Sequence, residues 1–160
     1  MNFYQQLGFL VFGSRLKRLG DTFLNDVNKI YKSQNIQFDA SWFPVFYILS
    51  EKGEVSIKEI SDELNVSHSA ISQLITGLQQ KGLIKSVVSK KDARHKAITF
   101  TAKGQKLLTK IQPIWNALQK SMVQLADENI ESKKILDALT TMEKNLQKET
   151  LFERVENFLK

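Results

Sequence analysis

The sequence predicts a mainly α-helical protein that carries one small β-hairpin. Two long amphipathic patterns occupy residues 12–30 and 107–125 of the 160-residue chain. Between them, two short helical patterns are followed by two β-branched runs, and positive charge is concentrated around these runs. Apolar residues three and four apart indicate helices, whereas short β-branched runs beside a polar loop indicate strands. This order predicts a helix-turn-helix followed by a hairpin wing, with long helices at both ends.

Composition narrows the class of protein further. The chain is 42% hydrophobic and 25% charged, with two prolines and no cysteine, which is typical of a folded protein without disulfides or thiolate metal sites. At this length we expect one domain, spanning 1–160, rather than two independent cores. No apolar run approaches the roughly 20 residues that cross a bilayer, and the N-terminus lacks the pattern of a signal peptide. We therefore expect a cytoplasmic protein with no membrane partner.

The first two helices are predicted from spacing and from a cap. The stripe of the first helix consists of Phe12, Leu16, Leu19, Phe23, Val27 and Ile30. Asp39 to Ser41 then provide an N-cap for a second helix over 42–49. Pro44 falls in the first turn of that helix, where its missing N–H removes no helical hydrogen bond. Gly53 is expected to follow the end of this helix.

The next two helices form the helix-turn-helix pattern. Ser56 and Glu59 have the spacing of a capping box, and Ser67 can cap the following helix. The apolar positions expected to face inward are Ile57, Ile60, Leu64, Ile71, Leu74, Ile75 and Leu78. On a helical wheel, polar side chains of the second helix lie opposite this stripe, so that helix presents a polar outer face.

A hairpin and two further helices complete the chain. Residues 84–88 and 97–101 are the β-branched runs that flank the polar loop 89–96. The apolar stripe from Leu107 to Leu125 predicts a long helix. Pro113 is expected to kink it, because an interior proline costs about 3 kcal/mol. A last helix is expected over residues 135–158, with a stripe that changes phase near Thr150.

Positive charge is concentrated at residues 81–110. This stretch holds nine Lys or Arg against one carboxylate, Asp92, and the rest of the chain holds 14 bases against 16 acids, for a total of +6. A basic patch beside a helix-turn-helix predicts double-stranded DNA as the partner, because neutralising phosphates releases condensed counterions. The predicted DNA contacts are Ser67, His68, Ser69, Ser72, Gln73, Thr76 and Gln80 on the helix and Lys90, Lys91, Asp92, Arg94, His95 and Lys96 in the wing.

Among these predicted DNA contacts, Gln73 and Arg94 have the clearest chemical role. The Gln73 amide can donate to and accept from an adenine edge in the major groove. Arg94 can enter a narrow minor groove, where negative potential is concentrated, while Asp92 holds the loop or Arg94 in place. Short polar side chains and a charged hairpin tip are also common on surfaces that bind nothing. Their position next to each other favours the DNA-binding interpretation.

The terminal helices predict a homodimer. Together they carry more apolar surface than a small domain can cover, and a symmetric dimer is the commonest way to cover it. The expected interface residues are Phe3, Leu7, Leu10, Phe152, Val155, Phe158 and Leu159. The alternative is that these side chains pack only within one chain.

The order of elements resembles the MarR family of winged-helix transcriptional regulators over essentially the whole chain. The most specific motif is Asp-x-Arg followed by Leu-Thr-x-x-Gly, represented here by residues 92–94 and 100–104. Phe100 replaces the usual Leu, and Ala93 stands where Gly or Arg is common. Residues 14–19 and 42–47 are similar to a subgroup often joined to a C-terminal acetyltransferase domain. These 160 residues lack that domain, so the resemblance implies a stand-alone regulator or a truncated form.

The resemblance implies a function and an organisation. Residues of about 40–104 would form the DNA-binding region, and about 1–35 and 105–160 would form dimerisation helices. The dimer would bind a pseudo-palindromic operator, with recognition helices in successive major grooves about 34–36 Å apart, and would act as a repressor. Many such regulators are released by a small aromatic or phenolic effector. The residues that could line an effector pocket are Phe12, Arg15, Trp42, Phe46 and Tyr47, although an aromatic cluster at helical spacing is also typical of a core.

The residues of the chain also bear on two other classes of function. An enzyme is disfavoured because His68 and His95 are the only histidines, neither begins a metal-ligand spacing, and no glycine-rich phosphate loop precedes a helix. We therefore expect no catalytic residue, cofactor or metal. The stronger alternative is a winged-helix module for protein interaction, in which the basic surface binds an acidic partner.

Overall fold

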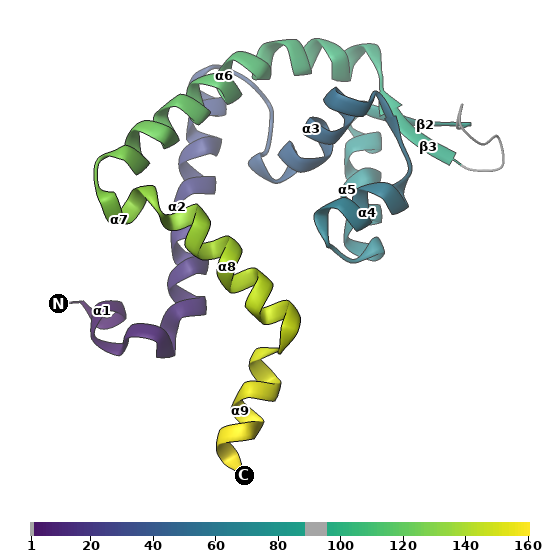
Figure 1. The fold of residues 1–160 in the computed structure, drawn as a ribbon. Coiled ribbons are helices and arrows are strands. Elements are labelled where there is room, and N and C mark those ends of the chain that lie inside the picture. The colour runs from purple at the N-terminus through teal and green to yellow at the C-terminus, as the bar shows by residue number, and fades with distance from the viewer. Residues whose placement is uncertain (1, 89–95) are drawn as a thin grey trace. The chain divides into compact units, whose positions relative to one another are not determined.

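The computed structural model describes residues 2–88 and 96–160, and the chain divides into two compact units, Met1–Gln112 and Pro113–Lys160. The elements of Figure 1 that begin in the first unit are α1 (Phe3–Leu7), the 3-10 helix η1 (Gly8–Val11), α2 (Phe12–Ser33), the 3-10 helix η2 (Ala40–Trp42), α3 (Phe43–Lys52), β1 (Glu54–Val55), α4 (Ile57–Leu64), α5 (His68–Gln80), β2 (Ile84–Val88), β3 (Lys96–Phe100) and α6 (Ala102–Asp127). The predicted class, mainly helical with a small β wing and long terminal helices, is confirmed.

The predicted helix starts are confirmed by hydrogen bonds. Asp39 Oδ1 accepts from the Ser41 amide at 2.8 Å, at the start of η2, which leads directly into α3. In the capping box of α4, Ser56 Oγ accepts from the Glu59 amide at 3.1 Å, and Glu59 Oε2 accepts from the Ser56 amide at 2.7 Å. Each bond satisfies an amide that has no partner within the helix, so local sequence fixes where these helices begin.

The sheet has one more strand than the sequence predicts. Its order is β1-β3-β2 with antiparallel pairing, and Val55 lies opposite Ile98 while Ile84 lies opposite Phe100. The Thr99 hydroxyl donates to the carbonyl of Gly53 at 2.9 Å and adds to the β1–β3 pairing. Two residues are too few to show the alternation that identifies a strand, which is why β1 escapes prediction.

An aromatic cluster joins the helices of the first unit to its sheet. Phe38 packs edge-on against both Tyr31 and Phe46, with ring centroids 4.9 Å apart in each pair. Phe46 also lies 4.9 Å from Phe100 of β3. Such tilted and edge-on contacts are the geometries that aromatic rings favour. The cluster therefore links the end of α2, helix α3 and strand β3 into one core.

The predicted Thr101–Gly104 motif is a packing joint between α6 and the segment that enters the wing. A Cβ built on Gly104 would lie 1.9 Å from the carbonyl oxygen of Leu83, so only glycine permits this approach. Thr101 Oγ1 accepts from the Gly104 amide at 3.0 Å, and the same hydroxyl donates to the carbonyl of Gly82 at 2.7 Å. The joint thus fixes the start of α6 against the chain that leads from α5 into β2.

The second unit contains the end of α6, α7 (Ile130–Lys133), α8 (Ile135–Lys148) and α9 (Leu151–Leu159). Helix α6 continues through Pro113, where the division between the units falls. The prediction of a single last helix is wrong, because Thr150 caps a new helix by accepting from the Glu153 amide at 3.2 Å. The change of phase in the apolar stripe therefore marks the end of one helix and the start of the next.

Candidate nucleic-acid interface

The turn between α4 and α5 is built from local hydrogen bonds. Asn65 ends α4 in the left-handed conformation, with φ of 50°, which Asn tolerates better than most residues. The Ser61 hydroxyl donates to the carbonyl of Val66 at 2.6 Å, and Ser67 Oγ accepts from the Ala70 amide at 3.3 Å to start α5. These bonds set the angle between the two helices without a long loop.

Helix α5 has one buried face and one polar exposed face. Ile71, Ile75 and Leu78 are buried, and Leu74 is half-buried. The polar side chains predicted to contact DNA are exposed at Ser67, His68, Ser69, Gln73, Thr76 and Gln80 and half-buried at Ser72. The predicted inward stripe of α5 is confirmed, and the helix presents hydrogen-bonding groups to solvent along its length.

Hydrogen bonds within α5 distinguish these polar side chains from one another. The Thr76 hydroxyl donates to the carbonyl of Ser72 at 2.8 Å, so its only proton is already used. Ser72 Oγ lies 3.4 Å from His68 Nδ1. Gln73 is exposed and its amide offers both donors and an acceptor, which is the chemistry needed for a two-bond contact to adenine. Gln80 is also exposed and carries the same amide, so Gln73 and Gln80 are the side chains of α5 best equipped to discriminate bases.

The wing is held in a fixed position relative to α5. Gln79 Nε2 donates to Ser86 Oγ of β2 at 2.8 Å, and the Leu83 amide donates to the carbonyl of Leu78 at 3.0 Å. Gly82 makes the turn between them with φ of 68°, which favours glycine. Gln79 was not singled out from the sequence, because a surface glutamine carries no signal of a partner seven residues away. These two hydrogen bonds hold strand β2 against the C-terminal end of α5.

The described part of the wing carries two lysines. Lys85 on β2 and Lys96 on β3 are both exposed, and Lys96 lies opposite Val88 at the end of the ladder. The remaining predicted wing contacts, Lys90, Lys91, Asp92, Arg94 and His95, lie outside the described residues.

The basic stretch of the sequence divides in space. Lys81 and three lysines of α6 line a cleft together with Trp42. They are therefore gathered in a hollow of the first unit, whereas Lys85 and Lys96 lie on the strands of the wing. Sequence proximity alone suggests a single cationic surface for DNA, but the fold creates two groups of charge.

The five residues predicted for an effector pocket occupy different environments. Phe46 is 0% exposed and belongs to the aromatic core described above. Phe12 and Trp42 are half-buried, while Arg15 and Tyr47 are exposed. Of the five, Trp42 alone lines the cleft that holds the lysines. An effector site at these residues stays a prediction.

The residues predicted for the dimer interface are all exposed in the single chain. Phe3, Leu7 and Leu10 precede α2, and Phe152, Val155, Phe158 and Leu159 lie on α9. Phe158 is the most exposed of them, at 92%. Exposed large apolar side chains at this density are typical of surfaces that bind another protein surface.

Two features of the described residues bear on other classes of function. Among residues 2–88 and 96–160, no group of three or more His, Cys, Asp and Glu side chains could hold a metal ion. Over the same ranges, every helix is either too short or too polar to cross a lipid bilayer.

Comparison with known proteins places this chain among helix-turn-helix proteins. A model of the MarR family matches residues 36–95, which include the helix-turn-helix. The HTH-type transcriptional repressor IacR of Pseudomonas putida is 26% identical over 117 residues, covering 72% of this chain and 69% of that protein. The match begins beside the C-terminal end of α2 and therefore centres on the region whose geometry is described above.

Solved structures share the fold at low sequence identity. The S. aureus MepR–DNA complex matches with a TM-score of 0.68 and 18% identity, covering 88% of this chain and 98% of that chain. Bordetella bronchiseptica BpsR, described as regulated in its DNA binding by 6-hydroxynicotinic acid, matches with a TM-score of 0.67 and 18% identity, covering 89% and 96%. These similarities extend over the terminal helices as well as the helix-turn-helix.

Proposed function

We propose that this chain is a transcriptional regulator of the MarR family that binds a specific double-stranded DNA sequence, as the match of residues 36–95 to that family supports. The observation that carries the proposal is the exposed polar face of α5, fixed beside the wing by the Gln79–Ser86 hydrogen bond. A helix with this outer face can enter a major groove, while the wing reaches the adjacent minor groove.

The proposed DNA contacts divide into two kinds. Ser67, Ser69 and the amides at the start of α5 favour phosphate, because a helix N-terminus carries partial positive charge. Gln73 reads a base edge, since its amide can form two hydrogen bonds with adenine. The lysines of the wing, with Arg94 in its loop, supply further phosphate and minor-groove contacts. Phosphate contacts give affinity, and Gln73 gives discrimination between sequences.

The regulator acts as a homodimer on a pseudo-palindromic operator. Support comes from the exposed apolar side chains of α9, including Phe152 and Phe158, for which a second copy offers a matching surface. In this arrangement the region of about 40–104 reads DNA, and the terminal helices join the two copies. The chain would then work as one functional unit despite its two compact parts.

Repression is the proposed outcome, with release by a small aromatic effector. The relative in Pseudomonas putida is named a repressor, and the DNA binding of BpsR is described as regulated by a small aromatic acid. In the dimer, the two copies of α5 can be spaced to fit successive major grooves or spaced otherwise. An effector can release DNA only if it binds the second state more tightly than the first. Arg15 and Tyr47, both exposed, are the proposed polar contacts for such a molecule.

Fluorescence anisotropy tests the proposal directly. The full chain is titrated into labelled DNA from upstream of its own gene and into an unrelated duplex, at several salt concentrations. A sequence-specific regulator binds the upstream DNA more tightly, and log affinity falls with log salt at a slope of about −0.9 per phosphate contacted. Equal and weak binding to both duplexes would contradict specificity for this DNA and favour the protein-interaction alternative.

The Gln73→Ala variant tests the reading helix. We expect a loss of about 1–3 kcal/mol on the cognate duplex and little change on the unrelated one, because only the base contact is removed. Gln147→Ala on the exposed face of α8 is the matched control, since it removes the same side chain far along the chain from α5. A uniform loss on all duplexes would mean that Gln73 contacts only the backbone of DNA.

A further inference from the structure

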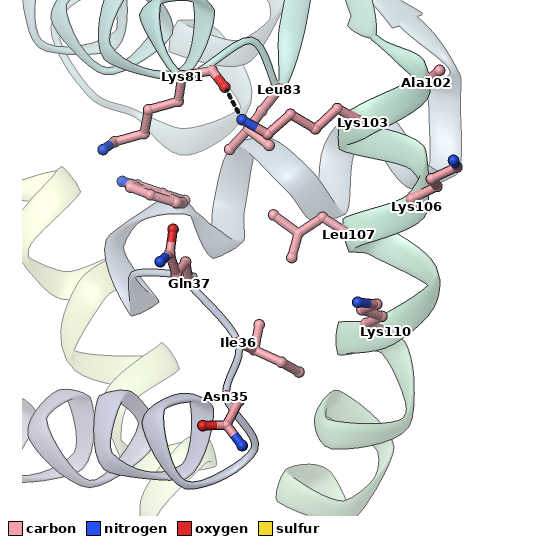
Figure 2. Close-up of a pocket in the computed structure, with 11 residues that line it drawn as sticks. Asn35, Ile36, Gln37, Lys81, Leu83, Ala102, Lys103, Lys106, Leu107 and Lys110 are labelled. Atoms are coloured by element: carbon pink, nitrogen blue, oxygen red, sulfur yellow. Dashed lines mark hydrogen bonds between the residues drawn. The ribbon is translucent and has the colours of Figure 1, made fainter.

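The cleft that contains Trp42 is a second charged site, separate from the exposed face of α5. Its volume is about 530 Å³, within the range of pockets that hold small ligands. The segment 35–37 forms one side and the first turns of α6 form the other, as Figure 2 shows. All of the lining residues belong to the first compact unit, Met1–Gln112.

Four lysines line this cleft. Lys103, Lys106 and Lys110 follow one another on α6 at spacings of three and four residues, which places them along the same side of the helix. Lys81 comes from the end of α5, 22 residues earlier in the chain than Lys103. Within the described ranges, no acidic residue lines the cleft and none of these lysines pairs with a carboxylate.

Two of the lysines are held in place by the protein. Lys103 Nζ donates to the carbonyl of Lys81 at 2.7 Å, the bond drawn in Figure 2. Lys81 Nζ lies 5.3 Å from the centre of the Trp42 ring, within the range of a cation–π contact. These contacts keep positive charge at the end of the cleft nearest α5. Lys106 and Lys110 extend the charge along α6.

Most of the other lining residues are apolar, and Asn35 and Gln37 are the polar ones among them. Ile36, Leu83 and Leu107 contribute hydrocarbon surface, and Trp42 adds an aromatic ring. A ligand that balances the charge must therefore carry several negative charges, and it gains further from a flat or apolar part. Inorganic phosphate alone would use the lysines but not this surface.

We propose that the cleft binds a small phosphorylated molecule with two or more negative charges and a flat ring, as in a nucleoside diphosphate. Lys106 and Lys110 contact its phosphates, and the apolar lining contacts its ring. A ligand with a single carboxylate would balance only one of the four lysines. The site is beyond the proposed DNA-binding role and does not depend on it.

Calorimetric titration of the full chain without DNA tests this site. The probes are ADP, pyrophosphate and adenosine, and we expect ADP to bind most tightly, pyrophosphate more weakly and adenosine not at all. The double variant Lys106→Gln/Lys110→Gln should weaken ADP binding by about tenfold or more, because two charged contacts are lost. The control Lys120→Gln/Lys144→Gln removes the same charge from exposed positions outside the cleft and should leave ADP binding unchanged.

Tryptophan fluorescence locates the bound probe. The chain has two tryptophans, so Trp115→Phe leaves Trp42 as the reporter, and ADP should change its emission in parallel with the heat signal. The proposal is overturned if ADP gives neither signal up to about 5 mM. It is also overturned if the cleft and control variants bind ADP equally well, or if adenosine binds as tightly as ADP.

Anisotropy with DNA separates this proposal from the previous one. The cleft double variant should bind the cognate duplex nearly as tightly as the unmodified chain does. If it loses DNA affinity while ADP binding is unchanged, the lysines contact the DNA backbone and the ligand site is wrong. If ADP binds as expected and no duplex is bound specifically, the DNA-binding proposal fails while the cleft stands.

Discussion

The two compact units differ in how their apolar side chains are used. In Met1–Gln112, residues from α2 to α6 supply a closed core that includes Tyr31, Phe46 and Ile111. In Pro113–Lys160, all of which the structure describes, no residue is buried, although the helices carry apolar stripes. Sequence periodicity is equally clear in both units. The difference shows that an amphipathic stripe predicts a helix but does not say which surface covers it.

The strongest test of this comparison is truncation of a core ring. We expect Phe46→Ala to lower the free energy of unfolding by about 3–5 kcal/mol, because Phe46 is fully buried between Phe38 and Phe100. Urea unfolding followed by circular dichroism measures the loss. A loss below about 1 kcal/mol would mean that the first unit has no closed core at this position.

A close approach of two backbones gives the next largest effect. Gly104→Ala should destabilise the chain by about 1–3 kcal/mol, because the added Cβ meets the backbone of Leu83 and this clash outweighs the higher helix propensity of Ala. Gly77→Ala is the control, since nothing lies within 4 Å of a Cβ built there within α5. The control should be neutral or more stable, and equal losses in both variants would contradict the packing joint.

A Phe→Ala substitution in α9 should weaken the association of two copies of the chain and leave the folding of each copy unchanged. Phe158→Ala should raise the dimer dissociation constant by about tenfold, because an exposed ring of the single chain becomes buried only against a second copy. Sedimentation velocity over a range of protein concentrations measures this constant. Glu156→Ala on the same helix is the control. An unchanged dissociation constant for Phe158→Ala would remove α9 from the interface.

The smallest effect concerns the start of α9 and its dependence on pH. The backbone amide of Thr150, followed by its hydroxyl, donates to the Glu153 carboxylate and lowers the pKa of Glu153. Since the folded pKa lies below the ordinary value, this stabilisation is present at neutral pH. It is lost as pH falls from about 4 towards the lowered pKa of the folded state. Glu153→Gln should slightly reduce helicity at pH 7, and its difference from the unmodified chain should be smaller at pH 3, as measured by circular dichroism. An equal difference at both pH values would exclude the carboxylate as the cause.

Local chemistry was enough to predict most of the helices and the hairpin. Ser56 and Ser67 cap their helices as expected, and β2 pairs with β3 as the β-branched runs predicted. The break at Thr150 was visible only as a change of phase, because a cap within a continuous apolar pattern resembles an irregular stripe.

The candidate DNA interface was predictable in part. The exposed face of α5 follows from apolar residues spaced three and four apart, which leave the polar residues on the opposite side of the helix, so Gln73 could be named from the sequence. Gln79 could not, because its role depends on Ser86, a residue on another element. Phe46 was named as a possible pocket residue or a core residue, and it is fully buried in the aromatic core of the single chain, while an effector site at the five residues stays a prediction.

By itself, the sequence determined most of the helices, the caps at Asp39, Ser56 and Ser67, the polar face of α5 and the resemblance to the MarR family, because each depends on residues a few positions apart. Only the tertiary structure decided the pairing of β1 with β3, the burial of Phe46 and the meeting of Lys81 with the lysines of α6. These features join residues far apart in the chain. No local period encodes such contacts, which form only when the helices and the sheet pack around a common core.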